Sequence, residues 1–247
     1  MRSVATRLQR FEFEARIFVS FGIVVFVCGL SFLASAQAPD NVVTVGRWIG
    51  LEPRAALRTG YLLAASAMAV ASILRMWSGS VLTSHRMMAF TVQRDRLITT
   101  GPYGVVRNPI YLADFVAFCA FAACLRPVGL ILPVLFFMHY SQLVAFEENA
   151  LRHRFSREFA AYVKEVPRFF PRFGSLPRLT RALTDIHITV DGFRHNGLYL
   201  LFVPGFMVAA VTGSLFWAIG IGLPGVVDWA VVHTQKGLQP GSRNGEE

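Results

Sequence analysis

Charged residues are scarce in this chain: they make up 16% of its 247 residues, whereas hydrophobic residues make up 54%. A soluble domain carries about a quarter charged residues, so this composition argues against a wholly soluble protein. Acidic residues are scarcer than basic ones, with 15 Asp and Glu against 24 Lys and Arg. The balance is typical of a protein that crosses a membrane with several helices.

Cysteine is also rare. Cys28, Cys119 and Cys124 all fall within apolar runs, and none belongs to a CxxC or Cys/His group. This spacing argues against a disulfide framework and against a structural zinc site. We therefore expect the cysteines to pack as small hydrophobic side chains, and we expect no metal.

Long apolar runs are what the chain does have. Since a spanning helix needs about 20 apolar residues, we predict an all-α, multi-pass membrane bundle of about five transmembrane helices with a cytoplasmic cofactor pocket. Trp77 is expected at the membrane interface. The predicted spans cover residues 17–36, 57–77, 110–125, 128–146 and 198–223. The third and fourth spans are short and meet at Arg126-Pro127, which predicts a tightly packed helical hairpin.

The basic residues lie mostly on one side of these spans. If the N-terminus is cytoplasmic, the cytoplasmic side carries most of the Lys and Arg residues, as positive-inside proteins do. Topology and attraction to membrane lipids then explain the net charge of +9, and no nucleic-acid partner is needed. We divide the chain into N-terminal transmembrane helices (1–79), a core (80–173) and a C-terminal extension with one further transmembrane helix and a polar tail (174–247).

One polar segment between apolar runs, residues 94–111 (RDRLITTGPYGVVRNPIY), is here called the loop motif. Gly101-Pro102 predicts a turn, and Asn108 is held extended by the proline after it. Pro109 suits the first turn of a following helix. A backbone fixed in this way is typical of a segment that holds a ligand.

Glu147-Glu148 should return to the loop motif, because the hairpin between them is antiparallel. Tyr140 and Glu147 are seven residues apart and share one helix face, whereas Glu148 is expected to pair with Arg152 or Arg154. Cations, amides, carboxylates and aromatic rings would then meet at one cytoplasmic surface. Such a set suits a zwitterionic, nucleoside-bearing ligand.

Residues 149–173 are basic and amphipathic. Leu151, Phe155, Phe159 and Tyr162 recur on one helical face, which should lie on the bilayer or cover the pocket. After them, the alternation of apolar residues at 186, 188 and 190 predicts either a short strand or an irregular helix.

Three motifs occur in order: G-P-Y-x-x-x-R-N-P-x-Y, then the glutamate pair, then F-x-x-x-F-x-x-Y-x-x-x-V-P-R. Residues 80–173 thereby resemble the isoprenylcysteine carboxyl methyltransferase and phospholipid methyltransferase group of membrane enzymes. The resemblance implies S-adenosylmethionine held between the loop motif and the hairpin. It also implies methyl transfer to a lipophilic or small acceptor from the bilayer, without a metal.

The cofactor contacts that the resemblance implies, together with Arg107 and Tyr140, which lie beside them, form the expected binding set. These residues are Arg96, Leu97, Ile98, Tyr103, Arg107, Asn108, Pro109, Ile110, Tyr111, Tyr140 and Glu147. Two positions depart from the family. Asn108 stands where a histidine is usual and cannot titrate, and Leu143 stands where an arginine usually meets the acceptor's carboxylate. Arg168 is the cation that could replace it.

Candidates for accepting a proton are His139 and Asp114. The alternative for His139 is a packed intramembrane residue, and for Asp114 a structural ion pair with Arg107 or Arg126. The acceptor stays open among a lipid amine, a small thiol and a prenylcysteine carboxylate.

A second reading of the whole chain is a non-catalytic binding or assembly protein on the same scaffold. A transporter is disfavoured because the ionisable residues gather at one face of the membrane. For the extension 174–247, three roles stay open: capping the pocket, forming an oligomer contact or selecting the acceptor.

Overall fold

The computed structural model describes residues 15–34, 38–82 and 97–238 of the chain. Within these ranges every regular element is a helix, which confirms the predicted all-α class. Arg94 and Arg96 of the loop motif lie outside the described residues.

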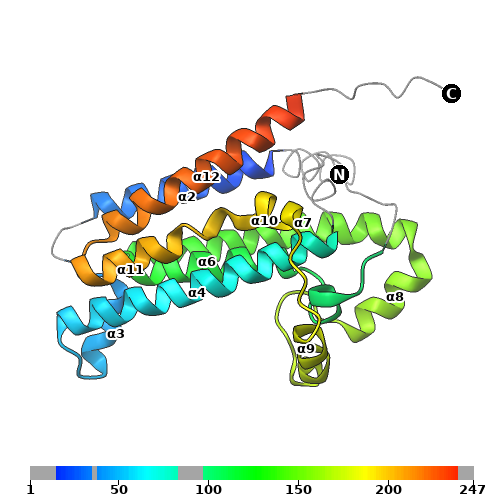
Figure 1. The fold of residues 1–247 in the computed structure, drawn as a ribbon, viewed down its shortest axis with the longest axis horizontal. Helices are drawn as coiled ribbons and strands as arrows, with labels where there is room; N and C mark the ends of the chain where they lie inside the picture. Colours follow the sequence, from blue (N-terminus) through cyan, green and yellow to red (C-terminus); the bar gives the residue numbers. More distant parts are fainter. Residues whose placement is uncertain (1–14, 35–37, 83–96, 239–247) are drawn as a thin grey trace, which may run out of the picture.

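Six longer helices run side by side along the molecule (Figure 1). They are α2 (Arg16–Leu33), α4 (Pro53–Leu82), α6 (Pro109–Cys124), α7 (Ile131–Arg154), α11 (Phe202–Thr212) and α12 (Leu215–Leu238). Among the described residues, four stretches are long and apolar enough to cross a membrane: Arg16–Leu33, Pro53–Leu82, Pro127–Arg154 and Val190–Thr212. The helices Pro109–Cys124 and Leu215–Asp228 are apolar but shorter. The multi-pass membrane architecture is thus confirmed.

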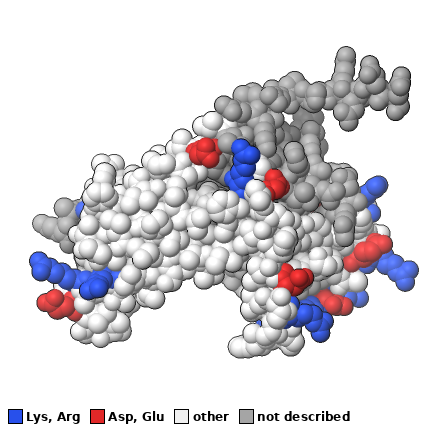
Figure 2. Space-filling model, in the orientation of Figure 1, with Lys and Arg blue, Asp and Glu red and all other residues white. Residues whose placement is uncertain are grey.

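Shorter elements connect these helices. They are α3 (Asn41–Trp48), η1 (Gly101–Gly104), η2 (Pro127–Leu130), α8 (Ser156–Glu165), η3 (Phe173–Ser175), α9 (Leu176–Leu183), α10 (Val190–Asn196) and η4 (Gly197–Tyr199). On the face shown in Figure 2, charged side chains lie at the α3 end and in the half that carries α8, α9 and α10, with an uncharged stretch between them.

The core forms around α4, which packs against both α6 and α11. Ala64, Ala65 and Ala71 of α4 are buried together with Ala117 of α6 and Phe206 of α11. Small side chains let helix backbones approach closely, which compensates for the weak hydrophobic drive between helices in lipid. The alanine-rich sequence of α4 therefore makes it the helix around which the others pack.

The predicted hairpin at Arg126-Pro127 is present, with η2 leading from α6 into α7. Arg126 donates to the carbonyls of Ser31 and Phe32 at 3.3 Å each, and also to that of Ala34. These carbonyls close α2, where helix ends leave acceptors unpaired. One arginine thus fixes the hairpin turn against α2.

The predicted single span over 198–223 is wrong. The chain reverses at Gly213, whose φ of 73° is in the left-handed region, and α11 and α12 pack against each other as a second hairpin. A glycine just after a helix ends it at little steric cost. Apolar composition alone did not distinguish one long helix from two short ones.

Trp77 is 4% exposed and packs inside the protein, where its ring lies beside Gly101 of η1. Helix α4 continues past it to Leu82. The proposed strand around Ile186 is absent from this described stretch, which is irregular until α10 begins. The chain between α2 and α4 contains the helix α3.

The basic segment after the hairpin is two helices rather than one, since α7 ends at Arg154 and α8 starts after a break at Phe155. On α8, Phe159 and Tyr162 are buried and pack with Leu97 just before η1. Of the two expected roles for this apolar face, the described contacts show it covering the loop motif.

Candidate functional site

The loop motif is held by the segment that follows α8. Tyr162 donates its hydroxyl to the carbonyl of Tyr103 at 2.7 Å. The backbone N–H of Arg107 donates to Pro167 O at 2.8 Å, and the Asn108 side-chain amide donates to Arg168 O at 3.1 Å. Hydrogen bonds therefore join the two motifs, G-P-Y-x-x-x-R-N-P and V-P-R, into one local structure.

Glu148 is the ionic centre of this structure. Its carboxylate is 4% exposed and accepts from Arg107 Nε at 2.9 Å and from Arg168 Nη2 at 2.6 Å. The expected pairing with Arg152 or Arg154 is therefore wrong, because the helix turns Glu148 inward. Charge-assisted hydrogen bonds of this kind are the strong ones, and two guanidinium groups on one carboxylate leave the cluster positive.

Glu147, the next residue, accepts from the Tyr111 hydroxyl at 2.9 Å. The Arg16 guanidinium at the start of α2 also acts electrostatically on this carboxylate. Asn108 lies 3.5 Å from Glu148 Oε1 through its Nδ2. Asn108 and Glu147 thus lie at the same end of the bundle, as the antiparallel hairpin predicted.

Asp114 is buried within a hydrogen-bonded cluster, and its partner differs from the expected Arg107 or Arg126. It forms an ion pair with Arg75 of α4, and it accepts from Tyr199 at 2.8 Å and from Tyr140 at 3.0 Å. A buried charge of this kind is stable only when paired and hydrogen-bonded. The cluster joins α4, α6, α7 and η4.

Tyr140 extends this cluster towards Glu147. Its ring centroid lies 4.7 Å from that of Tyr111, whose hydroxyl binds Glu147. His139 is 4% exposed on the same helix, with its ring 5.6 Å from the Tyr140 ring.

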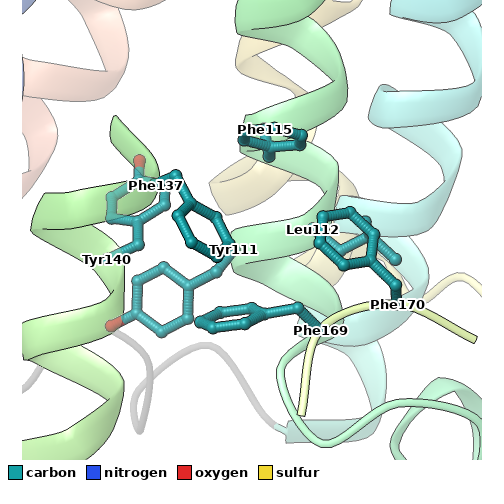
Figure 3. Close-up of a pocket in the computed structure, with 7 residues that line it drawn as sticks. All are labelled: Tyr111, Leu112, Phe115, Phe137, Tyr140, Phe169 and Phe170. Carbon is teal, nitrogen blue, oxygen red and sulfur yellow. The ribbon is translucent and has the colours of Figure 1, made fainter. Parts of the chain in front are cut away.

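An aromatic pocket lies between α6, α7 and the chain after α8 (Figure 3). Phe115 is 5.7 Å from Phe170, and Phe137 is 5.7 Å from Phe169, measured between ring centroids. Phe137 and Phe170 are 42% and 50% exposed, so one wall faces outward. The pocket is lined by Tyr111, Leu112, Phe115, Phe137, Tyr140, Phe169 and Phe170.

Sequence reasoning missed several of these residues. Phe169 and Phe170 directly follow the V-P-R motif, and this adjacency was the available signal. Arg75 and Tyr199 had no such signal, because they lie 39 and 85 residues from Asp114.

The donor and acceptor set fits S-adenosylmethionine. The Tyr103 hydroxyl is buried without a hydrogen-bond partner, and burial raises the pKa of Tyr103 well above its usual value, so it is a proton donor at neutral pH. Glu147 supplies a carboxylate that can accept from an ammonium or ribose hydroxyl, and the Tyr111 and Tyr140 rings can face a cation.

The other expected cofactor residues are also near this end of the bundle. Leu97 and Ile98 are half-buried before η1, while Pro109 and Ile110 begin α6. In the described ranges, no group of three or more His, Cys, Asp or Glu side chains could hold a metal ion.

Comparison with known proteins identifies one matching family. Residues 59–158 match the family described as phospholipid methyltransferase. No solved structure matches the chain.

Two curated relatives are named as metal-resistance proteins. The nickel-cobalt-cadmium resistance protein NccN of Alcaligenes xylosoxydans xylosoxydans is 28% identical over 129 residues, 51% of this chain and 55% of that protein. The chain thus matches only about half the length of this relative. The cobalt-zinc-cadmium resistance protein CzcN of Cupriavidus metallidurans is 25% identical over 177 residues, 71% of this chain and 75% of that protein.

The family match covers α6, α7 and their two glutamates, together with η1, most of α4 and the start of α8. The chain is thus a multi-pass membrane protein by its helices, and its residues 59–158 match the family described as phospholipid methyltransferase.

Proposed function

We propose that the protein is an S-adenosylmethionine-dependent methyltransferase that acts on a lipophilic or small acceptor delivered from the bilayer. One observation carries the proposal: Glu147, paired with Tyr111 at 2.9 Å, lies beside an aromatic pocket with an outward-facing wall. The family match supports a membrane methyltransferase in general, and the finer assignment rests on this juxtaposition.

S-adenosylmethionine would supply an already activated methyl group, so the protein has to bind, orient and exclude water. Glu147 and the Tyr103 hydroxyl provide an acceptor and a donor for the polar parts of this ligand. The rings of Tyr111 and Tyr140 provide faces for its positive charge. Phe115, Phe137 and their neighbours exclude water and receive the apolar part of the acceptor.

We infer which side chains accept a proton or bind an anionic group from the contacts that each of them makes. The oxygens of Asp114 are engaged by Arg75, Tyr140 and Tyr199, so it serves as a positioning group. His139, buried beside Tyr140, is the proton acceptor for an amine or thiol substrate. Arg168, whose side chain is 40% exposed beside Phe169, is the cation for an acidic group on the acceptor.

Calorimetry of the purified protein in detergent tests the proposal. S-adenosylmethionine should bind, and Glu147→Ala should weaken binding by at least about tenfold, the effect of losing one charge-assisted contact. Glu158→Ala, which changes an exposed glutamate on α8, is the matched control and should bind normally. Absence of binding heat with the natural chain would reject the proposal.

A second candidate function is a non-catalytic binding or assembly role. Its support is the departure at Leu143, which is 2% exposed and packs in an apolar cluster with Tyr140 and Phe136. The names of the two relatives add a physiological setting, resistance to nickel, cobalt or cadmium. Binding of S-adenosylmethionine without labelled methyl transfer into a membrane extract would favour this second role.

A further inference from the structure

An amphipathic helix beside the site has an apolar face that is largely exposed. On α9, Leu176, Leu179 and Leu183 share one side, while Arg178 and Arg181 lie on the other. Leu176 is 52% exposed and Leu183 is 50% exposed. Such exposure of leucine on a short helix would be unfavourable in water.

The exposed apolar surface extends beyond the helix. Phe173 just before α9 is 93% exposed, Ile186 and Ile188 after it are 41% and 37% exposed, and Val190 is 84% exposed. Figure 2 shows mostly uncharged atoms over the protruding α9, with charged atoms beside it.

The position of α9 along the chain places it at the level of the membrane surface. It contacts η1, which directly precedes the apolar helix α6. Seven residues after α9 ends, a candidate membrane span begins at Val190. This helix lies between a loop and the start of a candidate span and projects sideways from the bundle end (Figure 1), which is where a helix in the plane of a membrane surface is expected.

The charges of this segment favour a surface that carries negative charge. Within residues 173–190, Arg178 and Arg181 outnumber the one acidic residue, Asp185. Glu165 neutralises part of Arg178 at 3.2 Å, while Arg181 is exposed. Interfacial helices combine an apolar face in the acyl boundary with arginines at the phosphates.

We propose that residues 173–190 form an in-plane anchor, in which the leucine face of α9 enters the head-group region of the surrounding bilayer and its arginines bind anionic lipid. Because α9 rests on η1, the anchor holds the loop motif at the lipid surface. The inference concerns lipid binding alone, so it stands or falls separately from methyl transfer.

Depth-dependent quenching tests the anchor. The full chain, with its three cysteines replaced, carries Leu183→Cys labelled with bimane and sits as one copy per lipid nanodisc. Doxyl-labelled lipid should quench the probe and aqueous iodide should not, with stronger lipid quenching when phosphatidylglycerol is added to phosphatidylcholine. Glu158→Cys on α8 is the water-facing reference, and size-exclusion chromatography checks that each variant is folded.

Charge reversal separates the arginine contribution from a general charge effect. Arg181→Glu should abolish the response to phosphatidylglycerol, whereas Arg157→Glu, at an exposed arginine on α8, should retain it. Iodide quenching at Leu183→Cys in both lipid compositions would overturn the proposal. The proposal would also be overturned if the bimane probe were shielded from both quenchers only in nanodiscs that hold two copies of the chain. That result would indicate that a second copy covers the leucine face.

Discussion

At the scale of single residues, two buried carboxylates organise the site end of the bundle. Asp114 draws the Arg75, Tyr140 and Tyr199 side chains together, and Glu148 draws in those of Arg107 and Arg168. Each carboxylate joins segments that are far apart in the chain. Glu147, next to Glu148 in the chain, is half-buried and accepts a hydrogen bond from Tyr111.

The first prediction concerns Asp114. Asp114→Asn should lower the free energy of unfolding by about 3–5 kcal/mol, because the buried Arg75 guanidinium then loses the carboxylate charge that compensates it. Tyr199→Phe, which removes one hydrogen bond to this carboxylate, should cost about 1.5–3 kcal/mol. Thermal unfolding in detergent measures both effects.

A double replacement distinguishes charge imbalance from loss of packing. Arg75→Met with Asp114→Leu should recover much of the stability, since apolar groups of similar volume often replace a buried ion pair without loss. Exposed Asp185→Asn serves as the control. Equal stability of Asp114→Asn and the natural chain would contradict the predicted role of the ion pair.

The second prediction concerns Glu148. Glu148→Gln should loosen the segment around Arg168, because this carboxylate accepts two hydrogen bonds from the Arg168 guanidinium. Trypsin should then cleave after Arg168 faster than in the natural chain. Glu158→Gln should leave the cleavage rate unchanged, and an unchanged rate in Glu148→Gln would show that the backbone bonds to Arg107 and Asn108 suffice.

At the scale of elements, helix ends and helix contacts decide the topology. Gly213 separates α11 from α12, and η2 with Arg126 separates α6 from α7. Between helices, glycine allows close approach: a methyl group at Gly79 would lie 2.0 Å from the Asn196 amide nitrogen on α10. The extension therefore packs tightly on α4, and Tyr199 on it reaches Asp114.

The third prediction is a pair of glycine replacements with opposite signs. Gly213→Ala should destabilise the protein by about 1–2 kcal/mol, because an L-residue is strained at positive φ. Gly220→Ala, inside α12 with no atom nearby, should stabilise it by about 0.5–1 kcal/mol through lower backbone entropy in the unfolded chain. Thermal unfolding of the two variants under one condition measures the difference, and two shifts of the same sign would contradict it.

At the scale of the whole molecule, the second hairpin decides at which end of the bundle α12 finishes. Because α12 runs back along α11, it finishes at the end of the bundle where α2 starts (Figure 1). The backbone of Lys236, near the end of α12, is therefore at the same end of the bundle as the start of α2, whereas a single span over 198–223 would place it at the other end. This reversal strengthens the one-sided distribution of basic residues.

The fourth prediction follows from this reversal. Protease-sensitive tags at the two termini should be cleaved from the same side of the membrane, and that side should be cytoplasmic by the positive-inside rule. The accessibility of each tag to added protease is measured in sealed vesicles of both orientations. A tag inserted after Leu51, between α3 and α4, is the control for the opposite side of the membrane. Cleavage of the two terminal tags from opposite sides would contradict the hairpin α11–α12.

The sequence by itself determined the helical class, the membrane setting, the hairpin at Arg126-Pro127 and the approach of the loop motif to the glutamate pair. These features follow from composition, from proline and from the geometry of an antiparallel hairpin, all of which are local. Only the tertiary structure decided that Asp114 pairs with Arg75, that Glu148 faces inward, and that Phe169 and Phe170 line a pocket. Those contacts join residues from separate helices, and no periodicity within one helix specifies which side chain of another it meets.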